Sequence, residues 1–116
     1  MFYIANNSHD PHYNLAFEEY VFHNLSFDEP CLLLWQNEPS VIVGRFQNML
    51  EEINQEYIKQ HHVHVVRRIT GGGAVYHDLG NLNYTFIAKH QEKVLDFRKF
   101  TEPVIKALRE MGVPAK

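Results

Sequence analysis

The stretch that decides the fold runs from Arg67 to Asn81 and reads RRITGGGAVYHDLGN. Before it, the β-branched and alternating residues 63–69 predict a strand, and the alternating residues 82–88 predict another strand after it. Between them we expect a short strand over residues 74–77, bounded by the glycine turn and by a second turn at residues 78–81. The region therefore predicts three successive strands rather than a strand that leads into a helix.

The three adjacent glycines, Gly71–Gly73, form a backbone segment without side chains. Glycine loses more backbone freedom on folding than any other residue, so a triplet is more than a simple turn requires. Bare N–H groups beside Arg67 and Arg68 suit an anion such as a phosphate or a carboxylate. The stretch lacks both G-x-G-x-x-G at a helix start and G-x-x-x-x-G-K-[ST]. Taken alone, the glycines favour a hairpin with solvated arginines.

The whole string is more specific, because it resembles the R-R-x-[ST]-G-G-G-A-V-[FY]-H-D-x-G-N signature of lipoate–protein ligases. Residues 14–19 (NLAFEE) resemble the N-L-A-x-E-E helix start of that family, and residues 41–48 (VIVGRFQN) resemble its V-x-x-G-R-x-Q-N segment. The three matches follow the order of the family, and the resemblance extends over essentially the whole chain. It implies that lipoate and ATP form lipoyl-adenylate and pyrophosphate, after which an acceptor lysine attacks the adenylate.

Carried onto this sequence, the resemblance implies a set of residues that bind ATP and lipoate: Arg68, Gly72, Gly73, Ala74, Val75, Tyr76 and His77. Arg67 and Arg68 alternate along a strand, so we expect only Arg68 to reach the ligand. His77 and Asp78 are also adjacent and point to opposite faces, which argues against a directly paired base. We expect His77 to face the ligand or to make a structural hydrogen bond. Two roles remain open for Arg45, one that faces the ligand and one on the protein surface.

The resemblance also implies that residues 1–116 are a single catalytic domain that is incomplete at its C-terminus. In the family, further strands complete the sheet and carry the essential lysine, and Lys116 precedes that segment. No catalytic residue is therefore assigned within this chain, which we expect to be weakly active or inactive alone.

By resemblance, the substrates are ATP and lipoate, with Mg²⁺ accompanying ATP. The expected partners are lipoyl acceptor domains of 2-oxoacid dehydrogenase complexes or the glycine cleavage H protein. No metal site is predicted, since His61, His62 and His64 have no cysteine or carboxylate at zinc-ligand spacing.

Two alternatives remain beside the ligase. A transferase of octanoyl or lipoyl groups would need a nucleophilic cysteine, and Cys31 lies in an apolar run before the motif. A lipoate-binding fragment without activity would keep the loop and lack the chemistry. Biotin ligases, which share the fold, would need a G-R-G-R-x-[GR] loop that this sequence lacks.

Composition narrows the function classes further. The chain has 116 residues, of which 45% are hydrophobic, and a net charge of −3. This balance gives no basic footprint for nucleic acid or an acidic membrane. The longest apolar run, Cys31–Trp35, is too short to span a bilayer, and one cysteine excludes an internal disulfide. These features predict a cytoplasmic protein without nucleic-acid or membrane partners.

The order of elements predicts an α+β fold with a mixed or antiparallel sheet and helices on one face. By resemblance this is the fold of biotin and lipoate ligases and of class II aminoacyl-tRNA synthetase cores. Expected strands are 2–5, 31–36, 41–43, 63–69, 74–77 and 82–88, and expected helices end near residue 25, span about 50–61 and begin near 101.

Several local details are predicted as well. Asp10–Pro11 or Asn14 caps the first helix, whose Glu18 and Glu19 are expected to be solvated. Strands 31–36 and 41–43 should form a hairpin across a tight turn. The expected buried residues of the second helix are Leu50, Ile53 and Tyr57. Those of the strand after the glycine motif are Leu82, Tyr84 and Phe86.

Overall fold

The computed structural model describes residues 1–26, 28–89 and 97–116. The strands are β1 (Phe2–Ala5), β2 (Cys31–Trp35), β3 (Ser40–Val43), β4 (His64–Arg67), β5 (Val75–His77) and β6 (Asn83–Ile87). The helices are α1 (Pro11–Asn24), α2 (Met49–Glu52), α3 (Gln55–His61) and α4 (Phe97–Glu110). None of the helices in these ranges has the length and apolar character needed to cross a membrane.

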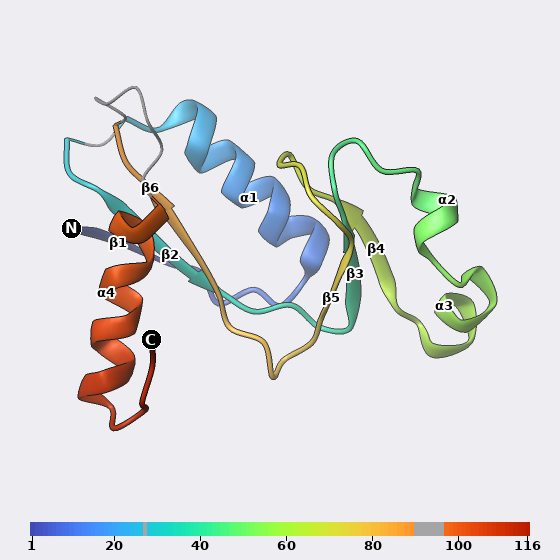
Figure 1. The fold of residues 1–116 in the computed structure, drawn as a ribbon. Helices are drawn as coiled ribbons and strands as arrows, with labels where there is room; N and C mark the ends of the chain where they lie inside the picture. Colours follow the sequence, from blue (N-terminus) through green and yellow to red (C-terminus); the bar gives the residue numbers. More distant parts are fainter. Residues whose placement is uncertain (27, 90–96) are drawn as a thin grey trace.

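The strands form two three-stranded sheets, β1-β2-β6 and β4-β3-β5. In each sheet the central strand pairs in parallel with one neighbour and antiparallel with the other. This arrangement confirms the predicted α+β class with mixed sheets. Figure 1 shows the two sheets side by side, with α1 lying along them and α2 and α3 at the far end of the second sheet.

The predicted hairpin of β2 and β3 is wrong, because these strands lie in different sheets. The backbone of residues 36–39 bonds to distant segments rather than across a tight turn. The N–H of Glu38 donates to the carbonyl of His9, and the carbonyl of Pro39 accepts from the N–H of His64. This link therefore carries the chain from one sheet to the next.

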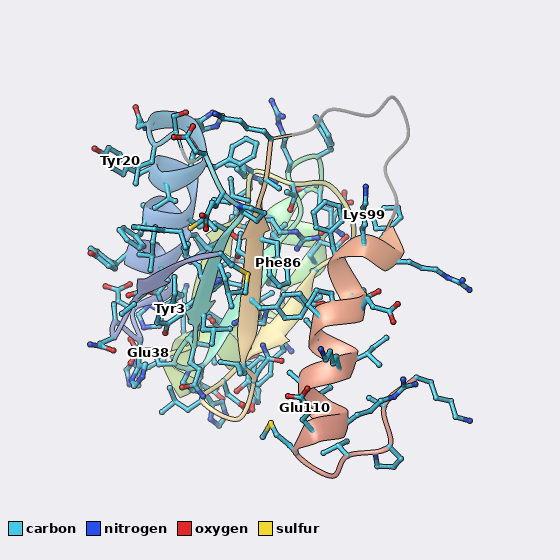
Figure 2. All side chains as sticks on the ribbon, turned by 90° about the vertical axis from the view of Figure 1, so that its left-hand side faces the viewer. Tyr3, Tyr20, Glu38, Phe86, Lys99 and Glu110 are labelled. Atoms are coloured by element: carbon cyan, nitrogen blue, oxygen red, sulfur yellow. The ribbon has the colours of Figure 1, made fainter. Side chains whose placement is uncertain are left out.

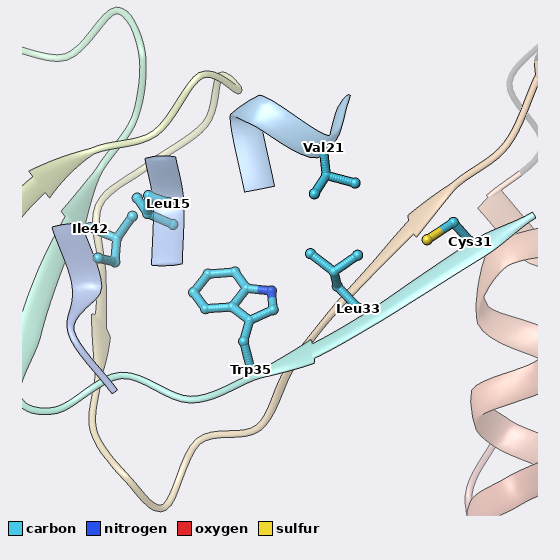
Figure 3. Packing of buried hydrophobic residues seen from close by; sticks show 6 residues of the cluster. All are labelled: Leu15, Val21, Cys31, Leu33, Trp35 and Ile42. Atoms are coloured by element: carbon cyan, nitrogen blue, oxygen red, sulfur yellow. The ribbon is translucent and has the colours of Figure 1, made fainter. Parts of the chain in front are cut away.

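Helix α1 begins where Asp10 caps it, since the Asp10 side chain accepts from the N–H groups of His12 and Tyr13. The predicted cap at Asp10 is confirmed, and the alternative at Asn14 is wrong because Asn14 is buried inside the helix. The helix packs on both sheets through one cluster, shown in Figure 3. Its buried members are Leu15, Val21, Cys31, Leu33, Trp35 and Ile42.

The predicted inward face of β6 is also wrong. Thr85 lies opposite the buried Leu33 of β2, so it shares the face that α1 covers. Phe86 lies opposite Leu32 on the other face, and Figure 2 shows it pointing toward α4. Because α1 and α4 lie on opposite sides of this sheet, the expectation that helices cover only one face fails too. Tyr84 is 44% exposed and Leu82 60% exposed.

The predicted second helix is two short helices, since Ile53 is extended and Asn54 starts α3 by accepting from the N–H of Tyr57. Leu50 and Tyr57 are exposed, contrary to the prediction of a buried face. Helix α4 starts at Phe97, before the predicted start near Thr101. Most of the predicted linker, residues 90–96, lies outside the described residues.

Candidate functional site

A cavity of about 860 Å³ opens between α1, the β2–β6 pair and the end of β5. Its walls are mainly apolar, and several polar groups gather where β4 and β5 approach it. Arg68, Val75, Tyr76 and His77, four of the site residues expected from the sequence, line it. Gly72, Gly73 and Ala74 lie in the loop beside it and are not wall residues. The polar and aromatic wall residues include Glu18, Phe22, His23, Trp35, Arg45, Thr70, Asn81, Asn83, Tyr84, Thr85 and Phe86.

Arg68 holds the glycine loop in place. Its Nη2 donates to the carbonyls of Gly71 at 2.9 Å and Gly73 at 2.7 Å, and its Nη1 donates to that of Ile42 at 3.1 Å. A guanidinium has five N–H donors, so these three bonds leave two without a partner among the described residues. Arg68 can therefore order the loop and still offer donors to an anion in the cavity.

Gly44 lets a second turn pack directly on the glycine loop. A Cβ at Gly44 would lie 2.0 Å from the carbonyl oxygen of Gly72, closer than side chains tolerate. The N–H of Arg45 donates to the carbonyl of Thr70 at 2.9 Å, which ties the two segments together. Gly44 entered the sequence analysis only as part of the segment 41–48, with no role of its own. Its place in the V-x-x-G-R segment was the available signal.

The side chains of Arg67 and Arg45 make different contacts. Arg67 donates from Nη1 to the carbonyls of Gly44, Arg45 and Gln47, so it fixes the neighbouring turn. Arg45 lines the cavity, and its guanidinium lies 5.3 Å from the ring centroid of Phe46. Arg45 is both exposed and part of the cavity wall, so its ligand-facing role stays a prediction.

Glu18 is a cavity residue that sequence reasoning missed. It is half-buried on α1, where its carboxylate accepts from the Thr85 hydroxyl. That hydroxyl accepts in turn from the indole N–H of Trp35 at 3.1 Å. Burial raises the pKa of Glu18, and the Thr85 hydrogen bond partly opposes this shift. The expectation that Glu18 is solvated is therefore wrong, because the first turns of α1 face the cavity as well as solvent.

The strong cations of the cavity wall are two arginines, Arg45 and Arg68. Burial, and after it the charge of Arg68, lowers the pKa of His77, and this shift favours the neutral imidazole. His77 Nδ1 lies 3.1 Å from Asn37 Nδ2. Asn83 adds a buried amide nitrogen that has no partner among the described residues. With a neutral imidazole beside Arg68, the cavity suits an apolar chain that ends in an anion.

A metal site and a cysteine nucleophile both find little support in the part of the chain that the structure describes. No group of three or more His, Cys, Asp or Glu residues there could hold a metal ion. Cys31 is fully buried, and burial raises the pKa of its thiol, which lowers the thiolate fraction that a nucleophile needs.

Comparison with known proteins identifies the class. The family model described as the lipoyl protein ligase A/B catalytic domain matches residues 10–116. Lipoate–protein ligase 1 of Staphylococcus aureus is 52% identical over 118 aligned positions, and lipoate–protein ligase LplJ of Bacillus subtilis is 51% identical over 118. Both alignments cover 100% of this chain and 36% of the relative. The chain belongs to the lipoyl protein ligase A/B catalytic-domain family, and it spans about a third of the length of these ligases.

Solved structures of lipoate–protein ligases are similar to this chain in fold. The chain resembles Plasmodium falciparum LipL1 in complex with lipoate, with a TM-score of 0.83 and 34% identity over 94% of this chain and 35% of LipL1. It resembles a bi-partite lipoate protein ligase from Thermoplasma acidophilum, studied with its E2 lipoyl domain, with a TM-score of 0.81 and 33% identity over 96% and 44%. A lipoate-protein ligase A bound with ATP gives 0.77 and 32% identity over 97% and 45%. These findings confirm the family and fold expected from the three motifs.

Proposed function

We propose that this chain supplies the lipoate- and ATP-binding part of an enzyme that activates lipoate and transfers it to protein lysines. The observation that carries the proposal is the cavity itself, whose apolar walls lead to Arg68 and the glycine loop. Its volume of about 860 Å³ lies within the usual range for small-molecule sites, and the wall arginines Arg45 and Arg68 match a fatty-acid-like ligand with an anionic end. The lipoate complex of LipL1 supports the same ligand.

In the proposed complex, the lipoyl chain lies along Trp35, Ile87 and Phe22, and its carboxylate accepts from a free donor of Arg68. Charge-assisted hydrogen bonds from a guanidinium are well suited to a carboxylate.

The glycine loop is proposed to hold the nucleotide. The N–H groups of Gly71, Gly72 and Gly73 have no acceptor among the described residues, so they are free to bind phosphate oxygens. The lipoate carboxylate would attack the α-phosphate of ATP and release pyrophosphate, and fixed donors beside the reacting phosphate would stabilise the developing charge. The ATP-bound ligase among the structural neighbours supports ATP as the second substrate. Mg²⁺ would enter with the ATP phosphates rather than at a site built by this chain alone.

We propose that the catalytic lysine, which would supply a cation for the adenylation step, lies after residue 116. A lysine amine of an acceptor domain would then attack the adenylate, forming the amide and releasing AMP. The structural study that pairs a ligase with its E2 lipoyl domain supports lipoyl domains as acceptors. Lipoyl domains of 2-oxoacid dehydrogenase complexes and the glycine cleavage H protein are the proposed partners.

The test is a chimera in which this chain replaces the matching 36% of the B. subtilis ligase. We expect lipoate-dependent ATP–pyrophosphate exchange from the chimera and little from the 116-residue chain alone. Arg68→Ala should abolish the exchange. Arg109→Ala should not, because Arg109 bonds only the carbonyl of Ala115 among the described residues, far along the chain from the cavity wall. A folded chimera without exchange, or exchange that survives Arg68→Ala, would overturn the proposal.

A further inference from the structure

A line of asparagines runs from the start of α1 to the cavity wall. Asn14 is 1% exposed and Asn37 is 0% exposed, so both amides need partners inside the protein. Asn6 Nδ2 donates to Asn14 Oδ1 at 2.9 Å, Asn14 Nδ2 donates to Asn37 Oδ1 at 2.9 Å, and Asn37 Nδ2 reaches His77 Nδ1 at 3.1 Å. We name this line of hydrogen-bonded side chains, Asn6–Asn14–Asn37–His77, the asparagine relay.

The contacts of Asn14 determine which atom donates and which accepts in each following hydrogen bond of the relay. Asn14 Nδ2 also lies 2.9 Å from the backbone carbonyls of Ser8 and Gln36, and carbonyl oxygens only accept. The Asn14 atom at this point must therefore be the donating nitrogen. Since it also faces Asn37, the facing Asn37 atom must be the oxygen, and the Asn37 nitrogen is left to face His77.

An amide nitrogen only donates, so His77 Nδ1 has to accept. In a neutral imidazole the proton then lies on Nε2. His77 Nε2 has no hydrogen-bond partner among the described residues, and the ring lies on the cavity wall, edge-on to Trp35 with centroids 6.0 Å apart. A second donor is thus available close to Arg68, whose charge reaches the imidazole.

We propose that Asn14 and Asn37 are positioning residues that fix His77 as the Nε2–H tautomer, so that it donates one hydrogen bond to the anionic head of the ligand beside Arg68. The identity of that ligand rests on the proposed function, whereas the tautomer does not. Carboxylate and phosphate oxygens accept and do not donate, so the opposite tautomer would set a lone pair against them. The relay also gives Asn14, the first residue of the NLAFEE segment, a role that a helix cap does not provide.

The tautomer is tested directly by ¹⁵N NMR of the histidine rings at pH 8, with His77 assigned by the signal lost in His77→Gln. We expect a protonated Nε2 and a non-protonated Nδ1 in the wild-type chain. In Asn37→Asp, the carboxylate can only accept, so the proton should appear on Nδ1. The control is Asn54→Asp, the same exchange at the exposed cap of α3, which should leave the His77 signals unchanged. A wild-type His77 protonated on Nδ1 would overturn the inference even if Asn37→Asp fails to fold.

The role of the donor is tested by lipoate titration of two further variants. His77→Gln can place an N–H where Nε2 lies, and His77→Asn can only reach the position of Nδ1. We expect His77→Gln to keep most of the affinity and His77→Asn to lose about tenfold, which corresponds to one hydrogen bond to a charged group. Equal affinity in both variants would overturn the donor role. If the wild type shows the Nε2–H tautomer but binds no lipoate, the proposed function and the ligand half of this inference fail together, and the tautomer assignment stands.

Discussion

Gly44→Ala tests whether the glycine loop depends on close backbone contact with the turn that follows β3. The added Cβ would lie 2.0 Å from the carbonyl oxygen of Gly72, whereas real Cβ contacts are essentially never shorter than 3.0 Å. The neighbour is backbone and belongs to a loop that Arg68 holds at two carbonyls, so it cannot rotate away as a side chain would. The loop and the turn must therefore separate by about 1 Å, the difference between those distances.

Separation breaks the bonds that join the two segments. These are the bond from the Arg45 N–H to the Thr70 carbonyl and the bond from Arg67 Nη1 to the Gly44 carbonyl, both at 2.9 Å. At roughly 1 kcal/mol for each bond, with the second one charge-assisted, we expect a loss of about 2–3 kcal/mol in the free energy of unfolding. Lipoate affinity should fall as well, because Arg68 is bonded to two carbonyls of the displaced loop.

The assay is urea unfolding of the wild type and Gly44→Ala, compared with Gly71→Ala as a matched control. A Cβ at Gly71 meets nothing within 4 Å, and Gly71 has no positive φ, so that variant should change the free energy of unfolding by less than about 1 kcal/mol. If Gly44→Ala were as stable as Gly71→Ala, the claim of backbone packing between loop and turn would be refuted.

Two other changes have predicted outcomes. Glu18→Gln should stabilise the chain at pH 8 relative to the wild type, because the raised pKa of Glu18 gives a stability that is present below pH 4.5 and lost as the pH rises through the raised pKa. Urea unfolding at pH 4 and pH 8 measures this, and a difference between the two proteins that does not grow with pH would contradict it. Asp10→Ala should lower the free energy of unfolding by about 1 kcal/mol through loss of the α1 cap, and Asp10→Asn should restore most of it. Equal stability of Asp10→Ala and Asp10→Asn by urea unfolding would show that the cap contributes nothing.

The parts of the fold that the sequence predicted are those with a local cause. Asp10 followed by Pro11 specifies the start of α1, and the alternating residues before and after the glycines specify β4 and β6. The strand Val75–His77 was also expected between the two turns. In each case a pattern of a few adjacent residues determines the backbone conformation.

The errors concern relations between segments that are distant along the chain. The pairing of β2 with β6 rather than β3 depends on where residues 36–39 place their backbone hydrogen bonds, and the partners include His9 and His64. The inward face of β6 could not be chosen by hydrophobic alternation, because helices cover both sides of that sheet.

In the candidate site too, the sequence predicted the residues of a local motif and missed those whose partners are distant along the chain. The motif pointed to Arg68 and His77, and both line the cavity. Glu18 was missed because its partner Thr85 lies 67 residues away, and Asn37 was missed because its environment is made by α1 and β5. Only the folded chain shows that Glu18 lines the cavity and that Asn37 contacts His77 from inside the protein.

The most direct test of the account uses Trp35, the single tryptophan of the chain, which lines the cavity and is 7% exposed. The measurement is its fluorescence during titration with lipoate, in the wild type and in Arg68→Ala shown to be folded by circular dichroism. We predict a saturable change in the wild type and an affinity at least about tenfold weaker in Arg68→Ala, because the variant loses charge-assisted bonds to the carboxylate. A fluorescence signal that does not saturate, or equal affinity in the two proteins, would contradict the claim that this cavity binds lipoate with its carboxylate at Arg68.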